Sequence, residues 1–270
     1  MRKSALLLLT LSLPLAAQSA SYRDPQTPRK NGKPDVTVPA PRMNGKPDLS
    51  GVWQAERAPL SEISSVLGSD FTDLQVDIND VGKYYIDAFW GLKPDQEPLR
   101  PEAGAIMKQR ANAPTPTARC LPAGIPGGLF IYAFKVIQTP REIVMLPESG
   151  DPPRQIYIDG RALPQNAQPS WSGYSVAKWQ GDTLVVETTG FNKESWLDAF
   201  GHPRSETMRV TETYRRRDFG HMDLEVNIDD PAYYTHPFGF KVQLDLIADG
   251  DVFEYICGEN EKDRIHIAKE

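Results

Sequence analysis

The fold is decided by residues 208–228, MRVTETYRRRDFGHMDLEVNI, in which apolar and polar side chains alternate. The apolar residues stand at every second position, as they do from Met222 to Ile228. Successive side chains of a β-strand point to opposite faces, whereas a helix would spread the same set around its axis. Residues 218–220, Asp-Phe-Gly, favour a turn, so the stretch predicts two paired antiparallel strands.

The same alternation recurs through the second half of the chain and once near its start. Ten strands are predicted: Ser50–Glu56, Phe134–Gln138, Glu142–Leu146, Gln155–Asp159, Gly173–Trp179, Thr183–Thr189, Glu206–Arg215, Met222–Ile228, Phe240–Leu246 and Val252–Cys257. Short antiparallel strands with polar turns favour a closed barrel or a strongly curved sheet, because closure removes exposed strand edges. The predicted fold is therefore mainly β, and residues 49–270 form a single barrel-like domain.

An insertion at residues 57–128 separates the first strand from the others. Short helices are expected at Ser61–Leu67 and Val81–Phe89, and a better one at Arg100–Ala111, where Pro101 suits a first helical turn. Loops of this length tend to be functional or disordered, so we expect the insertion to cover the mouth of the barrel.

Residues 1–19 have the pattern of a secretory signal peptide. Arg2 and Lys3 precede the apolar run Ala5–Leu15, and small residues follow at 17–19. The run is too short to span a bilayer, and no later stretch reaches the roughly 20 apolar residues that a span needs. The sequence predicts a soluble protein that is exported to the periplasm or secreted.

Residues 20–48 are rich in Pro, Gly and Lys and contain a short duplication. PRKNGKPD at 28–35 recurs as PRMNGKPD at 41–48. Few apolar residues are available for burial there, so we interpret the segment as an extended leader.

Charge argues against nucleic acid or an anionic membrane as the main partner. Loss of the two basic residues Arg2 and Lys3 with the signal peptide changes the formal net charge from −6 to −8. The basic run at 215–217 stands beside Asp218 and is interpreted as a solvated strand end.

The two cysteines, Cys120 and Cys257, predict one disulfide bond in an exported chain, although sequence alone does not show that they meet. They lack the CxxC spacing of a redox site, which favours a structural role.

The first strand carries Gly51-Val52-Trp53, which resembles the Gly-x-Trp of lipocalin and wider calycin barrels. The resemblance implies that Trp53 plugs one barrel end and that a late arginine packs over it, Arg264 being the nearest match. The long insertion departs from the lipocalin pattern.

A second resemblance covers nearly all of the mature chain. The motifs GKPDLSGVW (45–53), YIDGR (157–161), WQGDTLVVET (179–188) and ENEKD (259–263) are similar to those of a family of uncharacterised exported bacterial proteins. This resemblance implies export and a β-rich domain, and it transfers no activity.

The sequence contains no nucleophile elbow, zinc-binding helix, phosphate loop or dinucleotide fingerprint, and nothing in it requires a cofactor or assigns a metal. The first candidate site is His221, Asp223 and Glu225, which alternate and so share one strand face. They would suit a divalent cation or an acid–base pair, but the favoured interpretation is the solvated face of a strand.

The loop at 190–206 is the second candidate and the better functional prediction. It carries Trp196, Asp198, His202 and Glu206 between two strands. A desolvated carboxylate would tune His202 toward general-base catalysis. The alternative is a capped connection that Trp196 anchors and in which Asp198 accepts bonds from backbone donors.

The third candidate combines Asp159 and Arg161 with Trp171 and Tyr174. Arg161 would bind a ligand carboxylate while Trp171 stacks on a ring. A turn salt bridge beside a core aromatic explains the same residues. His236 would line the same mouth or pack on a short bend.

The leading hypothesis is an exported lipocalin-like protein that binds a small, partly apolar or aromatic molecule. The expected ligand contacts are Trp53, Asp159, Arg161, Trp171, Tyr174, Trp196 and His236. The alternative is a hydrolase, isomerase or lyase on the same scaffold, with His202 or His221 as base and Asp198, Glu206 or Glu225 as its partner. A third hypothesis is a structural module associated with the cell envelope.

Overall fold

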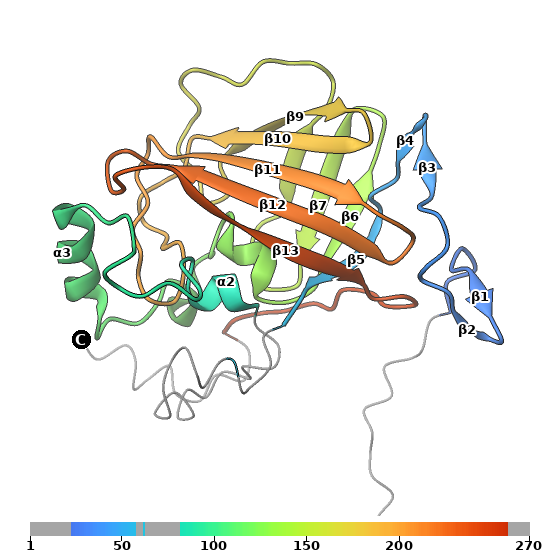
Figure 1. The fold of residues 1–270 in the computed structure, drawn as a ribbon, viewed down its shortest axis with the longest axis horizontal. Coiled ribbons are helices and arrows are strands. Elements are labelled where there is room, and N and C mark those ends of the chain that lie inside the picture. The colour runs from blue at the N-terminus through green and yellow to red at the C-terminus, as the bar shows by residue number, and fades with distance from the viewer. Residues whose placement is uncertain (1–22, 58–61, 63–81, 259–270) are drawn as a thin grey trace, which may run out of the picture.

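The computed structural model describes residues 23–57, 62 and 82–258 of the chain. Its main feature is a closed barrel of nine β-strands, which occupies the centre of Figure 1. In chain order the strands are β5 (Gly51–Ala55), β6 (Phe134–Gln138), β7 (Glu142–Pro147), β8 (Arg154–Tyr157), β9 (Tyr174–Gln180), β10 (Thr183–Thr189), β11 (Arg209–Arg216), β12 (His221–Asp229) and β13 (Phe238–Leu246). The mainly β prediction is confirmed, and β5 closes the ring by pairing with both β6 and β13.

The alternation in residues 208–228 has the predicted effect. β11 and β12 pair antiparallel, with Val210 opposite Ile228 and Tyr214 opposite Leu224. All four side chains are at most 1% exposed. Burying each of them stabilises the fold by roughly 1.5–3 kcal/mol. A slip of one residue would expose the whole set, so this burial also fixes the strand register.

Two details of the barrel differ from the prediction. The ring has nine strands instead of ten, because residues 252–257 lie in a loop. β13 already has β12 on one edge and β5 on the other, so no edge remains for the predicted last strand. The barrel is also not strictly antiparallel, since β8 and β9 run parallel with Ile156 opposite Ser175.

The described part of the insertion packs against the barrel (Figure 1). α2 (Lys83–Ile86) lies beside the short helix η4 (Gly127–Phe130), and the ring of Tyr84 stacks on Phe240 of β13 with centroids 4.0 Å apart. α3 (Pro101–Arg110) begins at proline, as expected, and η3 (Thr117–Arg119) follows it. The helix expected at Ser61–Leu67 lies outside the described residues except for Glu62.

Large apolar side chains pack together in the barrel core. Trp53, Phe134, Leu129 and Phe130 are each at most 2% exposed and belong to one continuous hydrophobic cluster. The indole N–H of Trp53 donates to the Leu49 carbonyl over 2.9 Å. Trp53 is thus part of the packed core and does not line an open ligand chamber.

Arg216 takes the place beside Trp53 that we expected for Arg264, which lies outside the described residues. The Arg216 guanidinium lies 4.8 Å from the Trp53 ring and donates to the carbonyls of Asp48 and Phe219. It is 5% exposed, so the interpretation of the basic run as a solvated strand end is wrong for its middle residue. Strand alternation puts Arg216 on the same face as Val210 and Tyr214, while its two neighbours face outward.

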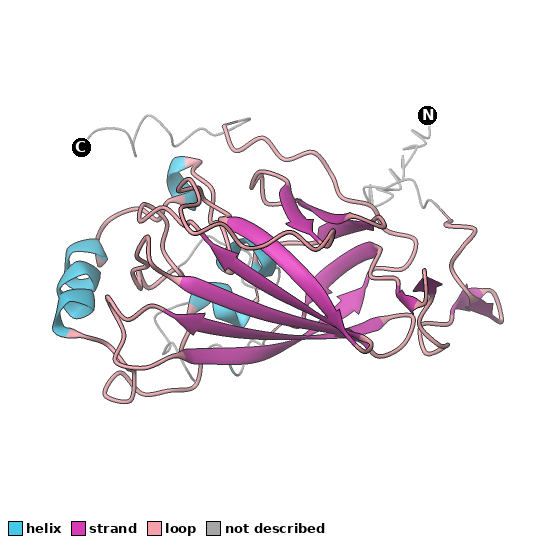
Figure 2. Ribbon diagram, turned by 90° about the horizontal axis from the view of Figure 1, so that it is seen from above, coloured by secondary structure: helices cyan, strands magenta, loops and turns pink. Residues whose placement is uncertain are grey.

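The duplicated leader forms two small hairpins, where we expected an extended segment. They are β1 (Arg29–Lys30) with β2 (Lys33–Pro34), and β3 (Arg42–Met43) with β4 (Lys46–Pro47). Each turns at an Asn-Gly pair with positive φ at both residues, the geometry of a type I′ turn. Figures 1 and 2 place the hairpins at the opposite end of the molecule from α3.

The predicted disulfide is present: Cys120 and Cys257 are bonded, with their Cα atoms 5.5 Å apart. The signal-peptide prediction at 1–19 lies outside the described residues. Within the described part of the chain, no helix has both the length and the apolar character that crossing a bilayer requires.

Candidate functional site

The loop at 190–206 brings together two of its predicted site residues. Nδ1 of His202 lies 2.6 Å from Oδ2 of Asp198, and the side chains are 2% and 0% exposed. The loop turns back on itself at this point, where the Leu197 N–H donates to the His202 carbonyl over 2.9 Å. The predicted desolvated carboxylate beside His202 therefore exists.

Two further carboxylates that the sequence did not suggest complete this cluster. Nε2 of His202 lies 3.1 Å from Oε2 of Glu97, and Asp87 at the end of α2 places a carboxylate oxygen within 4.8 Å of the Asp198 and His202 ligand atoms. Both come from the insertion, about a hundred residues away along the chain. No local pattern links them to the loop, so sequence reasoning had no signal for them.

The electrostatics of the cluster favour a charged imidazole. Burial opposes the charge, but Asp198 and Glu97 outweigh it and raise the pKa of His202 to about 10. Burial raises the pKa of Asp87 to about 6, although the hydrogen bond from the Phe89 N–H acts in the opposite direction. Repulsion from Asp198 adds to the rise. With both ring nitrogens donating to carboxylates, His202 has no free lone pair at neutral pH, and a general base needs one.

The other two predicted residues of the loop lie outside the cluster. Trp196 is 9% exposed, and the Arg110 guanidinium lies 4.9 Å from its ring, so it anchors the loop on α3. Glu206 is exposed. The buried Arg204, which sequence reasoning missed, donates to the carbonyls of Asn192 and Trp171 and so pins two loops together.

His221, Asp223 and Glu225 share one face of β12, as predicted, but each has its own partner. Nδ1 of His221 lies 2.7 Å from Asp218, while the carboxylate of Asp223 pairs with Arg217 at 3.1 Å. Glu225 pairs with Lys241 at 3.2 Å. These contacts suit a solvated strand face, which is the interpretation that the sequence favours.

Arg161 is engaged by its neighbours. Its guanidinium donates to Asp159 over 2.7 Å and to the Tyr174 hydroxyl over 3.0 Å, and it lies 3.6 Å from the Tyr157 ring centroid. The Arg161 side chain holds the pKa of Asp159 down at about 2. His236 is exposed, and its Nδ1 lies 2.9 Å from the Pro237 carbonyl.

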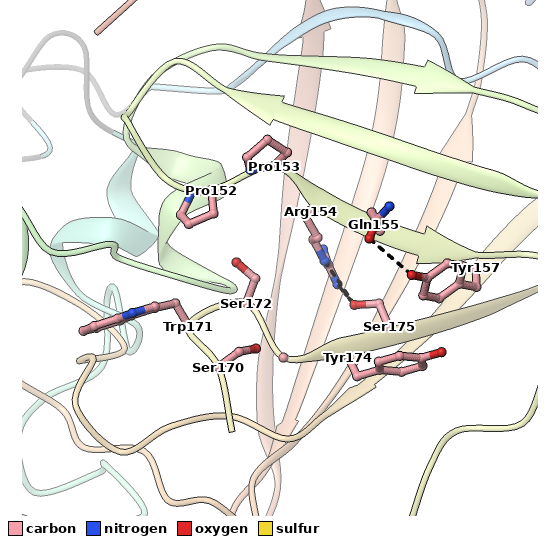
Figure 3. A pocket seen from close by; sticks show the side chains of 11 residues that line it. Pro152, Pro153, Arg154, Gln155, Tyr157, Ser170, Trp171, Ser172, Tyr174 and Ser175 are labelled. Atoms are coloured by element: carbon pink, nitrogen blue, oxygen red, sulfur yellow. Dashed lines mark hydrogen bonds between the residues drawn. The ribbon is translucent and has the colours of Figure 1, made fainter. Parts of the chain in front are cut away.

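A small cavity of about 240 Å³ lies where β8 and β9 diverge (Figure 3). Trp171 and Tyr174, two predicted ligand contacts, lie on its wall together with Arg154 and Ser175. The Arg154 donors are already used, because its guanidinium bonds Ser175 and pairs with Glu212 inside the barrel. The sequence offered one clue to this pair: Glu212 occupies an inward position between Val210 and Tyr214.

A larger cavity, of about 840 Å³, lies outside the barrel beside the disulfide. Sequence reasoning missed it, because its walls come from six separate segments. Its lining residues are Tyr85, Ile86, Ala111, Ala113, Pro114, Thr115, Thr117, Ala118, Cys120, Leu121, Pro122, Ile131, Tyr132, Ser149, Gly150, Ala199, Phe200, Tyr255, Ile256 and Cys257. Most of these side chains are apolar or aromatic, and the disulfide joins two of the walls.

No protein family model, curated protein or solved structure matches this chain.

Proposed function

We propose that this protein is exported and binds a small, partly apolar or aromatic molecule in the large cavity beside the disulfide. The cavity volume of about 840 Å³ carries the proposal. Small-molecule sites typically measure about 300–1,000 Å³ and combine apolar walls with a few polar groups. The cavity fits that description in both respects.

The lining suggests the chemistry of the ligand. Tyr85, Tyr132, Phe200 and Tyr255 offer aromatic surface for a ring or an isoprenoid chain. The hydroxyls of Tyr85 and Thr117 lie 2.7 Å apart on the wall and supply a polar contact to orient a ligand.

The location differs from that in an open lipocalin, whose ligand enters the barrel. Here Trp53 and Phe134 fill the barrel core, so the insertion and the C-terminal segment supply the binding surface instead. The stacking of Arg216 on Trp53 supports a lipocalin-like origin of the scaffold.

Two observations support export. The first residues have the composition of a signal peptide, and Cys120 and Cys257 form a disulfide, which persists in oxidising compartments.

Binding of the fluorescent aromatic probe anilinonaphthalene sulfonate (ANS) tests the site. Phe200, on the cavity wall, is 44% exposed, and Leu92, away from it, is 48% exposed. We expect saturable ANS binding that Phe200→Asp weakens at least about fivefold, since losing a binding-site aromatic costs more than ~1 kcal/mol. The matched variant Leu92→Asp should bind ANS like the unmodified protein. Equal weakening by both variants, or by neither, would rule out this cavity.

A further inference from the structure

We propose that Asp87, Asp198 and His202, assisted by Glu97, bind one divalent transition-metal cation, with Zn²⁺ as the ion that best fits the donor set. This site is separate from the proposed ligand cavity and does not depend on it.

Geometry is the first support. Asp87, Asp198 and His202 each place one ligand atom within 4.8 Å of the others, and all three residues are buried. They reach this point from α2 and from the loop at 190–206. Glu97, 3.1 Å from Nε2 of His202, lies on the side of the ring away from Asp198, so it orients the imidazole with Nδ1 toward the two aspartates. Imidazole nitrogen with carboxylate oxygen is a donor combination that zinc accepts in a four-coordinate site.

An unused acceptor is the second support. Asp87 is 8% exposed, and its Oδ1 accepts a 2.8 Å hydrogen bond from the Phe89 N–H. Within the described residues, Oδ2 of Asp87 accepts no hydrogen bond. Asp198, by contrast, accepts from the Ala88 N–H and from His202. A carboxylate oxygen that accepts no hydrogen bond from the described residues and lies close to a second carboxylate is available to a metal ion.

Charge balance is the third support. Three carboxylates, those of Asp87, Glu97 and Asp198, surround one imidazole, so acidic groups outnumber basic ones within the cluster. Among the described residues, no lysine or arginine forms an ion pair with Asp87, Glu97 or Asp198. The nearby Arg110 donates to the Gly201 carbonyl and stacks on Trp196.

The surroundings of the cluster are apolar, which strengthens the attraction to a cation. The Phe89 ring meets the His202 ring edge-to-face with centroids 4.8 Å apart, and Tyr234 packs against Phe89. Uncompensated charges are costly in such a medium. A divalent cation would offset two of the negative charges.

Metal retention by the full-length mature protein tests the proposal. Protein stripped with chelator would be equilibrated with ZnCl₂, desalted and analysed by mass spectrometry for bound zinc. We expect one zinc per chain. Asp87→Asn keeps the shape of the side chain and an acceptor for the Phe89 N–H, and it should weaken zinc binding by at least about tenfold.

Asp218→Asn is the matched control, because Asp218 also lies 2.7 Å from a histidine nitrogen, that of His221, but outside the cluster. This variant should retain zinc like the unmodified protein. If Asp87→Asn does not fold, two measurements on the unmodified protein test the site instead. Its melting temperature should rise with Zn²⁺ concentration and fall again when chelator is added. Bound Co²⁺ should give visible absorption. Failure of the unmodified protein to retain zinc would overturn the proposal, as would equal zinc binding by folded Asp87→Asn.

Discussion

Arg154 and Glu212 form an ion pair inside the barrel, with side chains only 2% and 0% exposed. Replacing either one alone leaves the other charge buried without its partner, so Arg154→Met or Glu212→Leu should each destabilise the fold by about 3–5 kcal/mol. The double variant should lose much less than the sum of the two, because it removes both charges. Urea unfolding of the four proteins gives the required free energies.

Arg42→Ala is the control for that prediction. Arg42 pairs with Asp182 at 2.7 Å, but both side chains are about half exposed, and such surface pairs contribute roughly 0–1 kcal/mol. Additive losses in the buried double variant would show that the Arg154–Glu212 pair is not the coupled unit that its geometry indicates.

Sequence predicts the contacts of a single side chain well only where the residue that it contacts is close along the chain. Asp198 and His202 are four positions apart in one loop, and their pairing was predicted. Asp87 and Glu97 join the same cluster from the insertion, and only the tertiary fold brings them there. Arg216 was misjudged because three consecutive arginines suggest solvent, although strand alternation turns the middle one inward.

Among the structural elements, β13 has no room for a side chain at Gly239. A Cβ there would lie 2.1 Å from the Val226 carbonyl oxygen of β12, and the paired backbone cannot move away. Gly239→Ala should therefore destabilise the protein by roughly 1–3 kcal/mol, the usual range for overpacking. Thermal unfolding under reversible conditions would measure the change.

Gly104 in α3 provides the opposite case. A Cβ there meets nothing within 4 Å, so Gly104→Ala should stabilise the protein by about 0.5–1 kcal/mol through helix propensity. A loss of stability in this variant, or no loss in Gly239→Ala, would contradict the described packing.

The bounds of a strand are predicted closely where its alternation and its turn residues define it locally. Whether a segment becomes a strand is not predicted where that depends on a free edge of a neighbouring strand. Thr183–Thr189 matches its predicted bounds, because alternation and turn residues define it without reference to the rest of the chain. The segment after Gly250 shows similar alternation but stays a loop, because β5 already occupies the strand edge that it would need.

For the molecule as a whole, the Cys120–Cys257 bond links the insertion to the C-terminal segment across 137 residues. The double variant Cys120→Ser/Cys257→Ser removes the link between these two segments. It should lose up to about 4–5 kcal/mol of unfolding free energy in the chain-entropy model. ANS binding should weaken as well, since the bond joins two walls of the cavity. An unchanged urea midpoint together with unchanged ANS affinity would contradict both expectations.

The parallel pairing of β8 and β9 follows from the odd number of strands in the ring. Neighbours in a ring of strands can all run in opposite directions only if the number of strands is even, and this ring has nine. One junction must therefore join strands of the same sense, and the chain places it where only two residue pairs are in register. An added strand at that junction would make the count even and let every neighbour alternate, so this seam is where the ring departs from a fully antiparallel barrel.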